Sequence, residues 1–157
     1  MQWAPLTSPY RGSNRLMATM ANDLQGAPPD GRTPLVLVAD DDDDTRTLFS
    51  IMLGMRGCAV IEAADGEEAV RLAESAGPDL ILMDGSLPRL DGFTAARRIR
   101  KTRNVPIVFV SGHAEPSFLA LAREAGCDEY LVKPPSLDHL GRVLQQYLGV
   151  GERAFAA

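Results

Sequence analysis

The sequence predicts an α/β fold in which five buried parallel strands alternate with five helices. Five short apolar runs are almost free of polar residues, as expected for strands that are covered on both faces. These runs are residues 35–39, 58–61, 80–83, 106–110 and 130–132. The stretches between them carry apolar residues at helical spacing. This alternation is typical of a parallel sheet whose strands are joined by right-handed crossovers.

The helices are indicated by apolar spacing and by capping residues. The last one is the clearest, because a single stripe contains Leu137, Leu140, Val143, Leu144, Tyr147 and Leu148. Ser136 is placed to cap that helix, and Asp65 with Glu68 has the spacing of a capping box before an earlier helix. Shorter stripes occur in the first and fourth helical stretches, with Leu48, Met52 and Met55 in one and Phe118, Leu121 and Ala125 in the other.

Length and composition predict one folded domain with short extensions. The chain has 157 residues, and residues 1–34 hold five of its 11 prolines. We expect a flexible extension over residues 1–33, a folded domain over 34–149 and a short tail over 150–157. No apolar stretch approaches the ~20 residues of a membrane span, and no secretory signal is evident. Cys58 and Cys127 have neither metal-ligand spacing nor a disulfide framework, so we expect buried thiols and a cytoplasmic setting.

The charge of the chain is concentrated in one short segment. There are 16 Lys and Arg against 21 Asp and Glu, and five of these acids form a run over residues 40–44. The rest of the chain is balanced, so the basic excess of a DNA-binding domain is missing. Arg97, Arg98, Arg100, Lys101 and Arg103 form a basic cluster on and after the third helix, which we interpret as a solvated face.

Residues with a carboxylate, a hydroxyl or an ammonium group that could form a ligand or reaction site follow four of the five apolar runs. Asp40 and Asp41 follow the first run, Asp84 the third, Ser111 the fourth and Lys133 the fifth. Ligands of open α/β sheets bind beyond the carboxyl ends of the strands, so these side chains are expected to meet there. After the second run comes Glu62, at the end of an expected edge strand, and we expect it to be solvated.

The predicted cluster has the composition of a phosphoryl-transfer site. Three neighbouring carboxylates repel one another unless a cation lies among them, and their hard oxygen atoms favour Mg²⁺, Mn²⁺ or Ca²⁺. A lysine and a hydroxyl in the same site suit phosphoryl oxygens. One carboxylate can then accept the phosphoryl group as an acyl phosphate.

Four segments together resemble the receiver domain of bacterial two-component response regulators. They are LVADDD at 37–42, PDLILMD at 78–84, LPRLDG at 87–92 and YLVKP at 130–134, in family order and spacing over roughly residues 34–149. The resemblance implies a flavodoxin-like (βα)5 sheet of strand order 2-1-3-4-5. It also implies phosphorylation by a histidine kinase or a histidine phosphotransfer protein, and a signalling role rather than that of an enzyme.

The resemblance assigns roles to the acidic residues by position. Asp84 is the expected phosphoacceptor. Asp40 and Asp41 are the pair that holds Mg²⁺, directly and through water, and the backbone carbonyl of Ser86 is a further ligand. Within the acidic run, Asp43 and Asp44 are expected to cap the first helix, with Asp42 at the rim of the site.

The resemblance also assigns roles to residues of the fourth and fifth strands. Lys133 and Ser111 are expected to stabilise the phosphoryl group, and Ser111 with Tyr130 to act as the switch. This switch changes the surface of the fourth helix, fifth strand and fifth helix. The bond before Pro134 is expected to be cis. Tyr130 has the alternative of packing as an edge-strand tyrosine that does not switch, and His113 is expected to be a surface residue.

The chain departs from the family at four positions. Gly85 follows Asp84 where a larger apolar residue is usual, which is expected to loosen the loop. Ser86 is small at a position that tunes dephosphorylation, Ser111 replaces the commoner threonine, and Pro135 stands where an aromatic residue often follows. None of these departures removes a required chemical group.

Two other functions are compatible with the same residues. One is a receiver-like docking module that acts without phosphorylation. The other is a Mg²⁺-dependent aspartyl phosphatase of the haloacid-dehalogenase type. That class has a second aspartate two residues after the nucleophile, where Asp84 is followed by Ser86; the Asp40–Asp42 pair has this spacing, but the chain offers little room for a cap or the remaining motifs. Because the predicted domain fills most of the sequence, we expect a stand-alone receiver without a DNA-binding domain, which binds a partner protein or passes the phosphoryl group onward.

Overall fold

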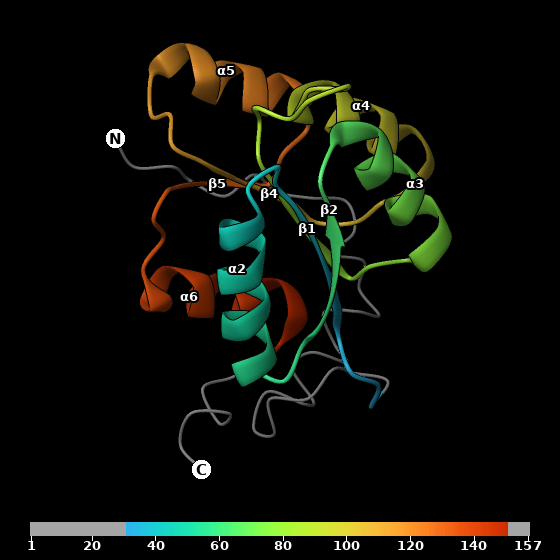
Figure 1. Ribbon diagram of the computed structural model, residues 1–157, viewed down its shortest axis with the longest axis vertical. Coiled ribbons are helices and arrows are strands. Elements are labelled where there is room, and N and C mark those ends of the chain that lie inside the picture. Colours follow the sequence, from blue (N-terminus) through green and yellow to red (C-terminus); the bar gives the residue numbers. More distant parts are fainter. Residues whose placement is uncertain (1–30, 151–157) are drawn as a thin grey trace.

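The five apolar runs form one parallel sheet in the computed structural model, which describes residues 31–150 (Figure 1). The strands are β1 (Leu35–Ala39), β2 (Ala59–Ala63), β3 (Leu80–Met83), β4 (Ile107–Ser111) and β5 (Glu129–Val132). Their order is β2-β1-β3-β4-β5, which confirms the predicted topology. The second strand extends further than its apolar run, because Glu62 pairs with Val38 and Ala63 with Ala39.

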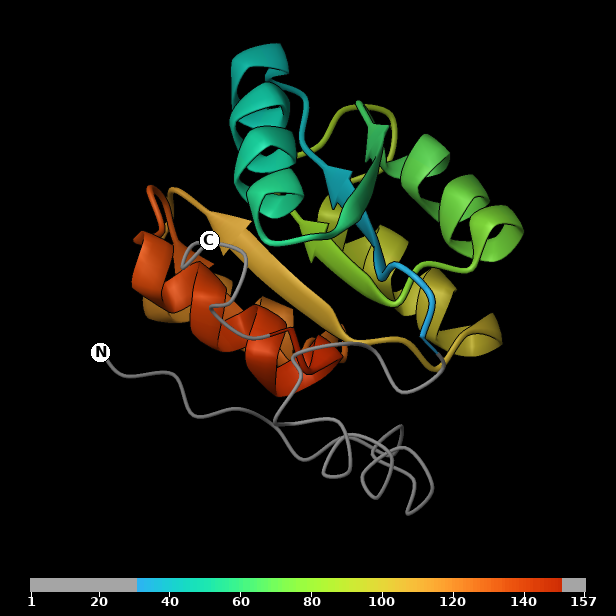
Figure 2. The same cartoon turned by 90° about the horizontal axis from the view of Figure 1, so that it is seen from below.

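Five helices cover the two faces of the sheet (Figures 1 and 2). They are α2 (Asp43–Met55), α3 (Gly66–Ala76), α4 (Gly92–Thr102), α5 (Pro116–Glu124) and α6 (Leu137–Leu148). On one face, α2 and α6 pack through Leu53 and Leu144 against Val36 and Val38 of β1. On the other face, α3, α4 and α5 form a second core around Phe109 of β4. Because both faces are covered, the central strands β1 and β3 are apolar throughout, whereas the edge strands β2 and β5 contain Glu62 and Glu129.

The start of α2 corrects one prediction about the acidic run. Asp42 is the N-cap, and its Oδ2 accepts a hydrogen bond from the Thr45 backbone N–H at 2.9 Å. Asp43 and Asp44 were expected to cap this helix, but they lie inside its first turn. The reason is geometric, since only the residue before the first helical turn can fold its side chain back onto the free N–H groups. The two acids still benefit from the positive end of the helix dipole.

Two further capping predictions are confirmed. Ser136 caps α6 by accepting from the His139 backbone N–H at 3.0 Å. Asp65 caps α3 by accepting from the Glu68 backbone N–H at 2.8 Å. The carboxylate of Glu68 turns back as a capping box requires, although it accepts from the Ala64 N–H at 3.4 Å rather than from that of the cap.

Two charged residues have more contacts than a solvated surface residue would. Arg100, in the basic cluster, donates to the Gly126 carbonyl at 2.9 Å and forms an ion pair with buried Asp128, so the prediction of a solvated face is wrong for this member. Glu62 is exposed as expected, yet it pairs with Arg46 at 3.1 Å. The Arg46 pair thus joins α2 to β2, and the contacts of Arg100 join α4 to the segment before β5.

Little of the predicted extension and tail lies within the described residues. Arg32 forms a bidentate pair with buried Asp79, with one bond of 2.7 Å, and Val150 packs in the core.

Cys58 and Cys127 are buried and free, as expected. Between residues 31 and 150, no helix has both the length and the apolar character needed to cross a membrane.

Candidate functional site

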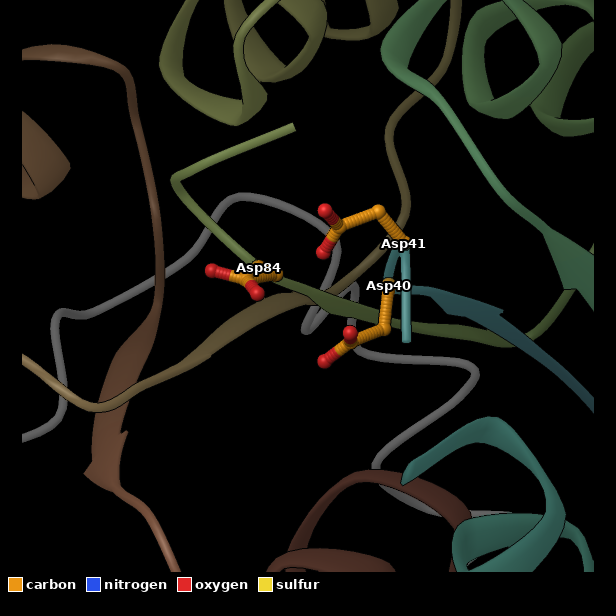
Figure 3. Close-up of side chains that lie close together, drawn as sticks. All are labelled: Asp40, Asp41 and Asp84. Atoms are coloured by element: carbon orange, nitrogen blue, oxygen red, sulfur yellow. The ribbon is translucent and has the colours of Figure 1, made fainter. Parts of the chain in front are cut away.

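Three carboxylates meet where β1 and β3 end (Figure 3). Asp40 directly follows β1 and Asp84 directly follows β3, and these strands are neighbours with Ala39 opposite Met83. Oxygen atoms of Asp40, Asp41 and Asp84 all lie within 4.8 Å of one another. Asp40 and Asp84 are buried, whereas Asp41 is exposed. The structure therefore brings the predicted acidic residues into one cluster that is open on the side of Asp41.

Lys133 reaches this cluster from the end of β5. Its Nζ forms an ion pair with Asp40 Oδ2 and lies 3.1 Å from Asp84 Oδ2. Burial lowers the pKa of Lys133, but the hydrogen bond to Asp40 and the charge of Asp84 outweigh burial and leave the pKa raised. The ammonium is therefore retained at neutral pH, and it links the two buried carboxylates.

Backbone groups orient the two buried carboxylates. Asp84 Oδ1 accepts from the Ser86 N–H at 3.0 Å, and Asp40 Oδ1 accepts from the Asp42 N–H at 2.9 Å. Arg46 donates to the Asp40 backbone carbonyl at 2.7 Å. Burial raises the pKa of Asp84, against the opposing effects of the Ser86 N–H and the Lys133 ammonium. Asp84 is thus a fixed carboxylate whose ionised form is disfavoured by its surroundings.

The donor set of the cluster fits a divalent cation. The three carboxylates and the one ammonium of Lys133 leave a formal charge of −2, with two of the acids removed from water. Carboxylate oxygens are the ligands that Mg²⁺ and related hard cations prefer. Asp40, Asp41 and Asp84 are therefore able to hold such an ion. Ser86 is exposed beside them, and its N–H is already directed at Asp84.

Close packing around two glycines fixes the segment that follows Asp84. A Cβ on Gly92 would lie 2.0 Å from the Asp84 carbonyl oxygen, and the Gly92 N–H donates to the Gly85 carbonyl at 2.9 Å. A Cβ on Gly85 would lie 2.8 Å from the ring of Phe93. Sequence reasoning interpreted Gly85 as a loosened position and missed Phe93, whose ring fills the space that a side chain at Gly85 would need.

The predicted switch residues are both buried and both contact the same loop residue. Ser111 Oγ accepts from the His113 N–H at 3.3 Å, and the Tyr130 hydroxyl donates to the His113 carbonyl at 2.6 Å. Burial is the largest cause of the raised pKa of Tyr130. The bond between Lys133 and Pro134 is cis, as expected. His113 is exposed, as predicted, but the local sequence pattern does not indicate the contacts of its backbone with Ser111 and Tyr130.

This arrangement of strands and acidic residues is that of a known family. Residues 36–145 match the response regulator receiver domain. The chain therefore belongs to the response regulator receiver family of two-component systems, and its relatives are signalling proteins.

Two curated relatives are transcriptional regulatory proteins. AfsQ1 of Streptomyces coelicolor is 37% identical over 120 residues, which are 76% of this chain and 53% of that protein. PdtaR of Mycobacterium tuberculosis is 42% identical over 106 residues, which are 67% of this chain and 52% of that protein. The chain thus spans about half the length of these relatives.

Solved structures show the same fold. The receiver domain of a Pseudomonas aeruginosa sensor histidine kinase, with magnesium coordinated in its active site cleft, has a TM-score of 0.71 and 37% identity, covering 75% of this chain and 99% of that one. The Vibrio cholerae chemotaxis protein CheY4 has a TM-score of 0.70 and 30% identity, covering 74% of this chain and 100% of that one.

Proposed function

We propose that this chain accepts a phosphoryl group on Asp84 from a histidine kinase or a histidine phosphotransfer protein. The observation that carries this proposal is the contact of Lys133 with both Asp84 and Asp40, because it joins a cation to two buried carboxylates at one edge of the sheet. A cation beside an oriented carboxylate suits the transfer of a charged phosphoryl group. The role is that of a cytoplasmic signalling protein, which accepts and loses this group without turning over a separate substrate.

In the proposed reaction Asp84 is the nucleophile. Its Oδ1 is held by the Ser86 N–H and its Oδ2 faces Lys133, so the carboxylate is oriented before a donor arrives. A carboxylate oxygen attacks the phosphorus atom, the bond to the donor histidine breaks, and an acyl phosphate forms. Lys133 stays beside the oxygens that carry the transferred charge. Water later hydrolyses the acyl phosphate and restores Asp84.

Asp40, Asp41 and Asp84 would hold Mg²⁺, together with the backbone carbonyl of Ser86. This ion would neutralise charge on the phosphoryl oxygens. The cluster of oxygens within 4.8 Å supports this assignment. So does the Pseudomonas aeruginosa receiver domain, which is described with magnesium in its active site cleft.

The proposed output is a change in the surface formed by α5, β5 and α6. Ser111 would turn toward the phosphoryl group and Tyr130 would follow, so phosphorylation favours the conformer that offers it more contacts. Three exposed apolar side chains lie on these elements, namely Leu121, Val132 and Leu137. Such side chains suit a protein partner that binds one conformer better than the other.

Labelling with acetyl phosphate and Mg²⁺ tests the proposal. We expect the wild type to gain the mass of one phosphoryl group and to lose it in hydroxylamine, as an acyl phosphate does. Asp84→Ala should not be labelled, whereas Asp44→Asn, which removes an exposed acid of the same run, should be labelled normally. Equal labelling of the wild type and Asp84→Ala would refute the assignment of Asp84, and turnover of a phosphomonoester would favour the phosphatase alternative.

A further inference from the structure

Arg46 is a largely buried cation that lies beside the acidic cluster. Its Nη1 donates to the Asp40 backbone carbonyl at 2.7 Å, its Nε donates to Glu62 Oε1 at 3.1 Å, and its Nη2 bonds to Asp43. Only 13% of the Arg46 side chain is exposed, compared with 86% of that of Asp43. One guanidinium thus holds together the segment after β1, the strand β2 and the first turn of α2.

Glu62 of β2 holds Arg46 in place. One carboxylate oxygen of Glu62 accepts from Arg46, and the other accepts from the Ser50 hydroxyl at 3.2 Å, one turn further along α2. The backbone of Glu62 is fixed relative to β1, because it pairs with Val38 in the parallel ladder. The guanidinium is therefore oriented by a residue of the sheet as well as by its own helix.

Asp41 depends on backbone contacts for its position. It is exposed, and within the described part of the chain its carboxylate has no hydrogen bond or ion pair, whereas the two buried carboxylates are held by Lys133. The peptide bond between Asp40 and Asp41 is planar, so the bond from Arg46 to its carbonyl also fixes the direction of the Asp41 Cα. On the other side, the Asp42 N–H donates to Asp40 Oδ1 at 2.9 Å. Both peptides that flank Asp41 are therefore tethered, one of them by Arg46.

We infer that Arg46 is a positioning residue, which fixes the backbone of Asp41 so that its carboxylate meets the two buried carboxylates at a divalent cation. The inference rests on the proposed Mg²⁺ site. The guanidinium contacts the backbone of Asp40 and leaves the carboxylate oxygens of the cluster to the metal. Outer groups that orient metal ligands typically contribute about tenfold to a hundredfold in metal affinity.

Charge and position predict opposite effects of Arg46 on the binding of Mg²⁺. A positive charge beside the cluster repels a divalent cation, so its removal by itself would strengthen binding. Loss of the bond to the Asp40 carbonyl would instead leave Asp41 less well placed and weaken binding. Arg46→Met keeps much of the apolar stem and removes the guanidinium, so the sign of the change in affinity distinguishes the two effects.

Titration of the full chain with magnesium chloride, followed by NMR, tests this inference. Arg46→Met should bind Mg²⁺ about tenfold more weakly than the wild type. Arg71→Met is the matched control, because it removes an exposed arginine of α3, and it should leave the affinity unchanged. Equal or tighter binding by Arg46→Met would overturn the inference.

A double-mutant cycle tests how Arg46 is held. Glu62→Ala should weaken the binding of Mg²⁺ by about twofold or more in the wild type, and it should have little effect when Arg46→Met is present, because Glu62 acts through Arg46. Additive effects of the two substitutions would overturn the part that is assigned to Glu62.

Hydrogen exchange without metal gives a second readout. Amides of residues 41–46 should exchange faster in Arg46→Met, while those of β3 and β4 should be unchanged, which also shows that the variant is folded. Unchanged exchange over residues 41–46 would overturn the positioning role even if the affinity falls. Failure of the wild type to bind Mg²⁺ would instead overturn the proposed metal site, and this inference with it.

Discussion

Replacing Lys133 with methionine should strongly destabilise the metal-free protein. The change keeps much of the apolar stem and removes the ammonium, which leaves Asp40 and Asp84 buried without their cation. The attraction at the 3.1 Å separation from Asp84 is about 5 kcal/mol at an effective dielectric constant of about 20. Removing Lys133 also removes the cost of dehydrating the ammonium, so the net loss is smaller. Breaking such pairs costs about 3 kcal/mol or more, or about 10 °C in Tm for a domain of this size.

The pH dependence of this loss follows from the charges. The pKa of Lys133 is raised above its ordinary value of 10.5, so its contribution is fully present at neutral pH and is lost only above that value. In Lys133→Met the two carboxylates repel each other, and protonation relieves this repulsion. The difference from the wild type should therefore shrink as the pH falls toward about 4, where carboxylates become neutral.

Urea unfolding in EDTA, followed by circular dichroism, measures the loss. Lys101→Met is the matched control, because it removes the other lysine of the chain, which is exposed in α4. Saturating Mg²⁺ should recover part of the stability of Lys133→Met, since it supplies positive charge to the same carboxylates. A loss below about 0.5 kcal/mol at neutral pH, the range of ordinary surface substitutions, would refute the reasoning. So would an equal loss at about pH 4.

Three other predictions concern the same domain. Asp84→Asn should raise the free energy of unfolding without metal and abolish stabilisation by Mg²⁺. Burial raises the pKa of Asp84, so the native wild type binds more protons than its unfolded state and loses stability as the pH rises above 3.8. The stability advantage of the variant should therefore grow over the same pH range. If Asp84→Asn did not have a higher free energy of unfolding in urea at neutral pH than the wild type, this reasoning would be contradicted. Gly54→Ala in α2 should raise the free energy of unfolding by about 0.5–1 kcal/mol, because nothing lies within 4 Å of the new Cβ. Gly92→Ala should instead lower it by about 2 kcal/mol or more, because the new Cβ clashes with the Asp84 carbonyl. Similar melting temperatures for the two variants would rule out this packing. Burial raises the pKa of Cys58 to about 11 and that of Cys127 to about 12, so both thiols should react with a disulfide reagent only after unfolding, and rapid labelling of the native protein would show otherwise.

Sequence patterns alone indicate the fold class and the residues at the strand ends. Apolar runs identify buried strands without any knowledge of their neighbours, and the first polar residue after each run lies at the carboxyl edge of a parallel sheet. Asp40, Asp84, Ser111 and Lys133 were found in this way. The strand order and the roles of these residues came from the resemblance of four segments, because periodicity does not state which strands are neighbours.

The contacts between side chains depend on how the helices and strands pack together. The pairing of Lys133 with Asp40 depends on residues 93 positions apart, and it requires β5 to be placed beyond β4. Within the acidic run, backbone geometry rather than composition selected Asp42 as the cap. His113 looks like an ordinary loop residue in sequence, yet its contacts depend on the placement of β4, β5 and α5. Local patterns record burial and turns, whereas contacts between distant side chains are fixed only when the elements pack together.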